Sequence, residues 1–141
     1  MVTLVGLCAV TAGCGTDGSK VFGEQSEPCS ATVLTNGPDD DEKIQHGADC
    51  LMAEFEAGRP VVWDVLVPTP EGDPIATRYE YDGDVVTITI KASEAITVDT
   101  TGGVPTLLLE TGTTDRTATY TGGSGTDTLT FQYTVQPGDS T

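Results

Sequence analysis

The sequence predicts a mainly β protein with one helix toward its N-terminal side. Beyond Pro60 the apolar residues recur with a period of two, and short segments rich in β-branched residues are separated by glycine or proline. From Thr97 to the end, 15 of 45 residues are threonine, which suits a pleated and half-exposed surface. These observations indicate an antiparallel β-sandwich, and a mixed α+β fold is the alternative.

The helix is predicted over residues 46–58. Its apolar residues are spaced i, i+3, i+4 and i+7, which places them on one face that we interpret as core packing: Ala48, Leu51, Met52 and Phe55. Gly58 is the expected C-terminal stop. The acidic run Asp39–Glu42 lacks the alternating ligands and central glycine of an EF-hand loop, so we interpret it as a solvated loop.

The strands follow in order, each bounded by turn residues. They are predicted over residues 61–67, 75–81, 85–90, 95–99, 106–109, 116–121 and 128–135. Asp82 and Gly83 form the dipeptide that tight hairpin turns favour, so the second and third strands are expected to pair.

Charge excludes several classes of function. The chain has 141 residues, with 22 Asp and Glu against 6 Lys and Arg, for a net charge of -16. Such a charge repels phosphate backbones and anionic lipid surfaces, so we expect neither nucleic-acid binding nor a basic amphipathic membrane anchor.

The N-terminus carries an export pattern. Residues 2–13 are apolar or small throughout, which is too short for a membrane-spanning helix of about 20 residues but suits a signal peptide. The tetrapeptide Thr11-Ala12-Gly13-Cys14 resembles the lipobox of bacterial lipoproteins. That resemblance implies a signal peptide at 1–13, a lipid on Cys14, a flexible tether at 14–28 and a place on the extracytoplasmic face of a bacterial envelope. The alternative is a buried N-terminal element with inert cysteines.

The same resemblance bears on the other cysteines. If Cys8 leaves with the signal peptide and Cys14 carries the lipid, Cys29 and Cys50 remain in an oxidising compartment, where they are expected to form a disulfide. The bridge would close a loop of about 20 residues and contribute on the order of 3 kcal/mol. A metal pair is the competing interpretation, but His46 is the only other soft ligand.

A set of short motifs lies between residues 50 and 90: Cys50-Leu51, Ala57-Gly58-Arg59-Pro60, Val62-Trp63-Asp64, Glu71-Gly72-Asp73-Pro74-Ile75 and Tyr81-Asp82-Gly83. This stretch resembles a family of small actinobacterial lipoproteins of unassigned function. The resemblance implies an extracytoplasmic α+β region at 29–82 and supplies no catalytic residues.

A second set of motifs lies between residues 84 and 141: Val85–Ile90, Ser93–Ala95, Pro105–Leu109, Ala118–Tyr120, Gly122–Gly125, Leu129–Phe131 and Tyr133–Val135. Their order resembles the immunoglobulin-like repeats of bacterial surface adhesins. It implies an immunoglobulin-like β region at 83–141. Because such repeats continue past a Gly-Asp pair like that at 138–139, the sandwich is expected to be incomplete, with an unpaired edge.

Two kinds of binding site are suggested by residue type. Aspartates at loop positions could supply the hard oxygen ligands that calcium prefers: Asp82, Asp84, Asp99, Asp115 and Asp127. Solvated acidic loops are the alternative. An aromatic ligand pocket could be lined by Trp63, Tyr79 and Tyr81, although aromatic residues at this spacing also pack across strands.

These features point to a non-enzymatic cell-envelope lipoprotein. No catalytic residues are expected, because the only histidine, His46, has no indicated partner, and no cofactor is expected apart from calcium. The module would serve in adhesion, spacing or protein binding through exposed β-edges and loops, with a protein or a surface glycan as its partner. A small-ligand-binding extracytoplasmic lipoprotein is the alternative.

Overall fold

The computed structural model describes residues 29–111 and 114–139, so the predicted signal peptide, tether and lipidated Cys14 lie outside it. Its elements are β1 (Thr32–Val33), α1 (Asp40–Glu56), β2 (Val61–Pro68), β3 (Pro74–Tyr81), β4 (Val85–Ile96), β5 (Thr106–Leu109), β6 (Arg116–Gly122) and β7 (Thr126–Thr134). All seven strands belong to one sheet, in the order β1-β2-β3-β4-β7-β6-β5. The predicted mainly β class, with a single helix among the described residues, is confirmed.

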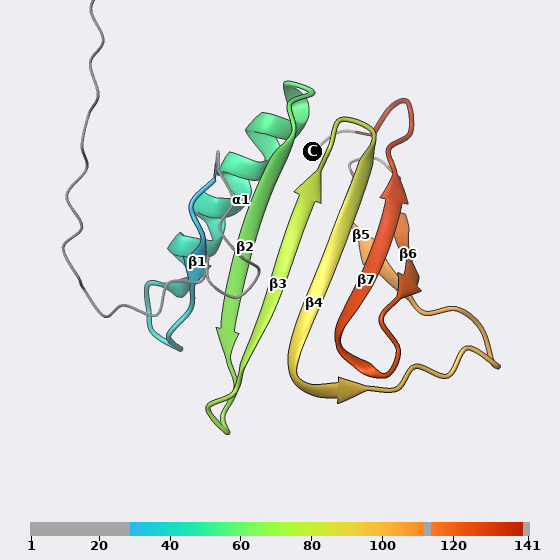
Figure 1. Ribbon diagram of the computed structural model, residues 1–141. Helices are drawn as coiled ribbons and strands as arrows, with labels where there is room; N and C mark the ends of the chain where they lie inside the picture. The colour runs from blue at the N-terminus through green and yellow to red at the C-terminus, as the bar shows by residue number, and fades with distance from the viewer. Residues whose placement is uncertain (1–28, 112–113, 140–141) are drawn as a thin grey trace, which may run out of the picture.

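The sheet continues across the expected boundary between residues 82 and 83. β2 pairs with β3 from Val61↔Tyr81 to Pro68↔Pro74, and β3 pairs with β4 from Tyr81↔Val86 onward. β1 is parallel to β2, and the other neighbours are antiparallel. Figure 1 shows α1 behind β1 and β2, and β5 behind β6 and β7. One continuous sheet therefore curls into a sandwich-like arrangement, with α1 and β5 over the same face.

That inner face carries two apolar clusters. The first is built on Cys29, Val61, Trp63, Val65 and Tyr81, and the second on Ile88, Ala118 and Phe131. Tyr79 and Val86 pack against both clusters. Since residues opposite one another in a sheet share a face, the register of β2 to β7 brings these side chains to one side.

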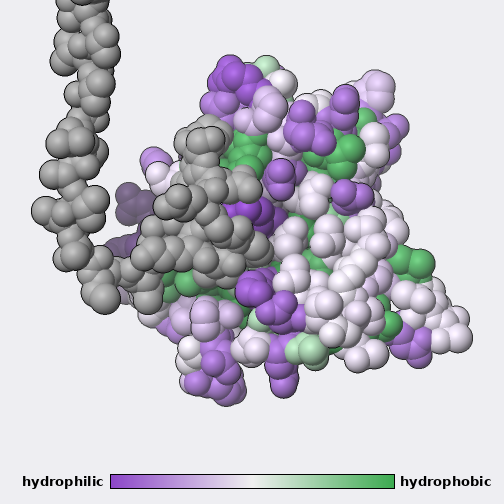
Figure 2. Space-filling model, viewed as in Figure 1, coloured by the Kyte–Doolittle hydropathy of each residue, from purple (hydrophilic) through white to green (hydrophobic). Residues whose placement is uncertain are grey.

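The outer face of β4, β7, β6 and β5 is rich in threonine. Gln132 lies opposite both Thr87 and Thr119, and Thr119 lies opposite Thr106 on β5. The Gln132 side-chain amide donates a hydrogen bond to Thr87 Oγ1 at 3.3 Å. Figure 2 shows this side as a pale surface of intermediate hydropathy over these strands. The threonine-rich segments thus form the pleated, half-exposed surface that their composition predicts.

The helix begins earlier than the prediction. It starts at Asp40, so interpreting the acidic run as a solvated loop was wrong. The Asp40 carboxylate accepts the N–H groups of Thr35 and Gly37 at 2.9 and 3.1 Å and the Lys43 ammonium at 3.0 Å. Carboxylates in a first helical turn also interact favourably with the helix dipole.

The end of the helix follows the predicted glycine stop. Gly58 has a φ of 64°, a left-handed conformation that glycine adopts without strain. Its N–H donates to the Phe55 carbonyl at 2.9 Å, and the Arg59 N–H donates to the Glu54 carbonyl at 2.9 Å. This pair of bonds is a Schellman motif, which satisfies carbonyls at the end of α1. The last helical residue is Glu56 rather than residue 58.

The predicted separate strand at residues 95–99 is wrong. β4 runs from Val85 to Ile96, and its register with β7 shifts between Lys91 and Ile96. An irregularity of this kind bends a strand without ending it. The alternation is interrupted there, so the sequence reads as two strands where the chain forms one.

Candidate binding groove

A groove of about 440 Å³ lies on the inner face between α1 and β5. Leu51, Met52 and Phe55 of α1 line one side, and Leu107 and Leu109 of β5 line the other. The central strands β3 and β4 form its base. Its size falls within the roughly 300–1,000 Å³ range of ligand sites, and most of its lining is apolar.

The groove exists because α1 and the β5–β6 hairpin cover different parts of the inner face. Phe55 of α1 packs on Tyr81, with ring centroids 4.8 Å apart. At the other end Tyr120 packs edge-on against Phe131, with centroids 5.7 Å apart. Each covering element is therefore fixed to its own apolar cluster, and the surface between the two clusters stays uncovered.

The three aromatic residues predicted for a pocket are divided between groove and core. Tyr79 and Tyr81 line the groove. Trp63 does not, because it is 6% exposed and its Nε1 donates to Thr32 Oγ1 at 3.0 Å. Trp63 instead stacks on Tyr79 from behind the groove, with centroids 5.4 Å apart. Its role is the cross-strand packing that was the alternative to a pocket.

Two sides of the groove were not assigned from the sequence. Met52 was placed with the core face of the helix, yet it borders the groove and is not part of either apolar cluster. Leu107 and Leu109 came only with the adhesin-like motifs. The local signal was present in both places, as one extra apolar residue on the helix face and a run of three leucines beside Pro105.

The polar groups of the groove are mainly tyrosine hydroxyls. Burial raises the pKa of Tyr79. Burial, followed by a hydrogen bond to Asp139, raises the pKa of Tyr133. The Tyr81 hydroxyl donates to the Gly83 carbonyl at 2.7 Å. Both shifts keep the phenols neutral, so the groove presents uncharged rings to a ligand, while Glu110 at its border is exposed.

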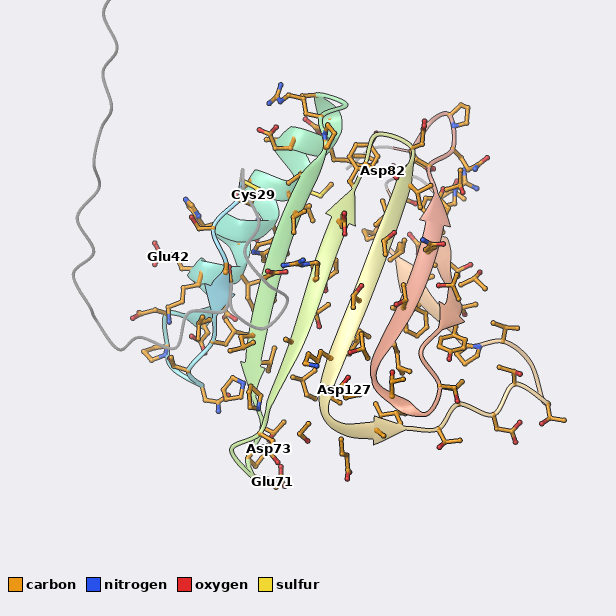
Figure 3. The ribbon with its side chains drawn as sticks, in the orientation of Figure 1. Cys29, Glu42, Glu71, Asp73, Asp82 and Asp127 are labelled. Atoms are coloured by element: carbon orange, nitrogen blue, oxygen red, sulfur yellow. A yellow bond between two sulfur atoms is a disulfide. The ribbon has the colours of Figure 1, made fainter. Side chains whose placement is uncertain are left out.

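The structure does not bring the five suggested calcium ligands together. Asp82 and Asp84 lie in the β3–β4 turn, where Asp82 Oδ1 accepts the N–H groups of Asp84 and Val85 at 3.0 and 2.8 Å. Asp127 pairs with Lys91 at the opposite end of β4, as Figure 3 shows. Asp99 bonds to the Thr101 N–H, and Asp115 precedes β6. Among residues 29–111 and 114–139, no three His, Cys, Asp or Glu side chains are grouped to hold a metal ion.

The predicted disulfide is present and fixes one side of the groove. Cys29 and Cys50 are bonded, with Cα atoms 5.8 Å apart, and Cys29 is buried in the first cluster. The bridge ties the segment before β1 to the middle of α1 (Figure 3). It also occupies both thiols that could have acted with His46, which is exposed on α1.

Every lysine and arginine in the described part of the chain is paired with a carboxylate. The pairs are Lys43–Asp40, Arg59–Glu54, Arg78–Asp64, Lys91–Asp127 and Arg116–Asp139. The Arg78–Asp64 pair is buried on the outer face, with two hydrogen bonds of 2.8 Å. The surface formed by these residues therefore presents carboxylates in excess and no uncompensated lysine or arginine.

Fold and groove define the class: a mainly β, disulfide-bonded, strongly acidic protein with an apolar groove on the inner face of its sheet. Comparison with protein-family models, curated proteins and solved structures finds no match to this chain. Within the described residues no helix is both long and apolar enough to cross a membrane.

Proposed function

We propose that this protein is a non-enzymatic, lipid-anchored module of the bacterial cell envelope that binds a protein partner. The single observation that carries the binding role is the apolar groove between α1 and the edge strand β5. An exposed apolar surface of this kind beside an open sheet edge is a common protein-recognition feature.

The envelope location is supported by the N-terminal sequence and by the disulfide. The Thr11-Ala12-Gly13-Cys14 pattern supports lipidation at Cys14. A disulfide between Cys29 and Cys50 is typical of an oxidising compartment outside the cytoplasm. The test is the intact mass of the protein recovered from a bacterial membrane fraction. Cleavage before Cys14 with added lipid is expected, and an unmodified full-length mass in the soluble fraction would refute this location.

The composition of the groove supports binding without catalysis. The titratable side chains among its lining residues are tyrosines and glutamates, with no histidine or cysteine. Its rings and leucines suit apolar side chains of a protein better than a hydroxyl-rich glycan. The pairing of all five described lysines and arginines, and the net charge of -16, also disfavour anionic partners such as nucleic acid.

The groove also favours the second candidate function, binding of a small apolar ligand, because its volume suits such a molecule. A photo-crosslinking residue at position 52 distinguishes the two functions in intact cells. The matched control carries the same residue at position 53, since Ala53 is exposed on the same helix. We expect a peptide of another protein to be attached at position 52 and not at position 53. A small-molecule mass increment would favour the alternative, and no adduct at position 52 would refute a binding groove.

A further inference from the structure

We infer that the partner binds as an added β-strand on the free edge of β5, with alternate side chains in the groove and with cationic flanks. This inference rests on the proposed function, because it specifies the partner of the same groove. Three independent observations carry it: the hydrogen-bonding pattern of β5, the exposure of its side chains and the charge of the surrounding surface.

The first observation is which backbone groups of β5 are free. The Tyr120 N–H donates to the Pro105 carbonyl at 2.9 Å, and the register pairs Leu107 with Ala118. Backbone groups of an antiparallel strand alternate in direction, so Leu107 and Leu109 bond to β6 while Thr106 and Leu108 direct their N–H and C=O groups away from it. β5 is the last strand in the sheet order, so these groups form a template for another strand.

The second observation is the exposed apolar surface on both sides of that edge. Leu107 and Leu109 line the groove, whereas Leu108, on the other face, is 72% exposed. Val104, just before the strand, is 53% exposed. An added strand would extend the sheet over the groove toward Met52 of α1, and every second side chain would enter the groove. Backbone pairing with pockets for alternate side chains is how edge strands recognise extended peptides.

The same geometry separates a strand from a lipid chain or a small apolar molecule. Either of those would fill the groove, but it would leave the outward N–H and C=O groups of Thr106 and Leu108 without a protein partner. An extended segment satisfies these backbone groups and fills the groove together, so it uses both features of the site.

The third observation fixes the charge of the partner. The five described lysines and arginines are each held by a carboxylate, in a chain of net charge -16. Glu110 lies at the end of β5, beside the groove. Lysine or arginine residues flanking the apolar segment would be attracted to this surface, and acidic flanks would be repelled.

The test uses the full-length oxidised chain and a capped synthetic peptide in which valines alternate with threonines between paired terminal lysines. Two further peptides isolate the terms. One has the same side chains with alternate backbone amides N-methylated, and the other replaces the lysines with glutamates. Binding is measured by calorimetric titration, and the site by amide hydrogen exchange of Thr106 and Leu108. We expect the lysine peptide to slow both exchanges, and each altered peptide to bind roughly tenfold more weakly or worse.

A protein variant tests the edge from the other side. Leu108→Pro removes an outward N–H while leaving the bonds from β5 to β6 in place, and proline is tolerated at such edge positions. Leu108→Ala is the matched control, because it removes the same side chain and keeps the N–H. We expect roughly tenfold weaker peptide binding for Leu108→Pro than for Leu108→Ala. The N-methylated peptide tests the same bonds on the unaltered protein.

The outcomes separate this inference from the proposed function. Binding that is lost in Met52→Gln, but is indifferent to N-methylation and to Leu108→Pro, would overturn strand addition while keeping a protein-binding groove. Equal binding of the glutamate peptide would overturn the cationic partner. If no peptide binds and no protein crosslinks at position 52, both the inference and the protein-binding function are refuted.

Discussion

Gly47 of α1 lies against the Trp63 indole with no room for a side chain. A Cβ at Gly47 would lie 2.3 Å from Trp63 Nε1 and 2.4 Å from its Cε2. Non-bonded carbon atoms pack at about 3.5–4.0 Å, so the indole would have to move by about 1 Å or more. We therefore predict that Gly47→Ala displaces Trp63, although alanine is the better helix former.

The size of the effect follows from three contributions. Overpacking a core costs about 1–3 kcal/mol. Moving the indole also strains or breaks the 3.0 Å bond from Trp63 Nε1 to Thr32 Oγ1, which is worth about 1 kcal/mol. Replacing a helical glycine by alanine returns about 1 kcal/mol. The net loss is about 1–3 kcal/mol, which lowers Tm by roughly 5–10 °C for a domain of this size.

The assay is built into the sequence, because Trp63 is the only tryptophan of the chain. Displacement from the core should shift its fluorescence emission to longer wavelength, and thermal unfolding should report the lower Tm. Gly102→Ala is the control, since Gly102 is exposed and a Cβ there meets nothing within 4 Å. A Gly47→Ala protein with unshifted emission and a raised Tm would show that helix propensity outweighs the clash, and would refute the reasoning.

Three further predictions concern the disulfide, the buried ion pair and the helix start. Reducing Cys29–Cys50 should cost about 3 kcal/mol by restoring loop entropy to the unfolded chain, and an unchanged melt in reductant would contradict this. Asp64→Ala leaves the Arg78 guanidinium buried without that carboxylate and should cost about 3–5 kcal/mol in denaturant unfolding; converting Arg78 to methionine in the same protein should recover part of the loss. A lysine hydrogen bond, with two backbone N–H groups, lowers the pKa of Asp40 from 3.8 to about 2. Its stabilising contribution is therefore complete above pH 3.8 and is lost as the pH falls toward 2, so an Asp40→Asn protein should lose less stability than the parent between those pH values.

Elements set by local chemistry could be predicted from the sequence. The Asp82-Gly83 pair forms its hairpin turn because the Asp82 carboxylate accepts backbone N–H groups and Gly83 takes a φ of 112°. The end of the helix at Gly58 follows from its left-handed conformation in the same way. The start of the helix was missed because a run of acids is stable both in a solvated loop and in a first helical turn. The deciding contacts, from Asp40 to Thr35 and Gly37, depend on the shape of the loop before it.

The groove could be predicted only in part. Alternation places Trp63, Tyr79 and Tyr81 on one face of the sheet, but it does not say which of them α1 covers. The same limit applies to the outer face, where the ion pair of Asp64 and Arg78 depends on the β2–β3 register. No pattern within β5 reveals that its two inward leucines face α1, because that contact depends on how the whole sheet curls.

The two apolar clusters explain why this groove remains open and what an added strand would do. α1 is held to the first cluster by the disulfide and by Phe55, while β5 and β6 are held to the second. Tyr79 and Val86 touch both clusters and lie at the base of the groove between them. A strand on β5 would cover that shared surface and bury apolar area belonging to both clusters. Binding at the edge would therefore stabilise α1 and the β5–β6 hairpin together, although no contact between these two elements is needed in the free protein.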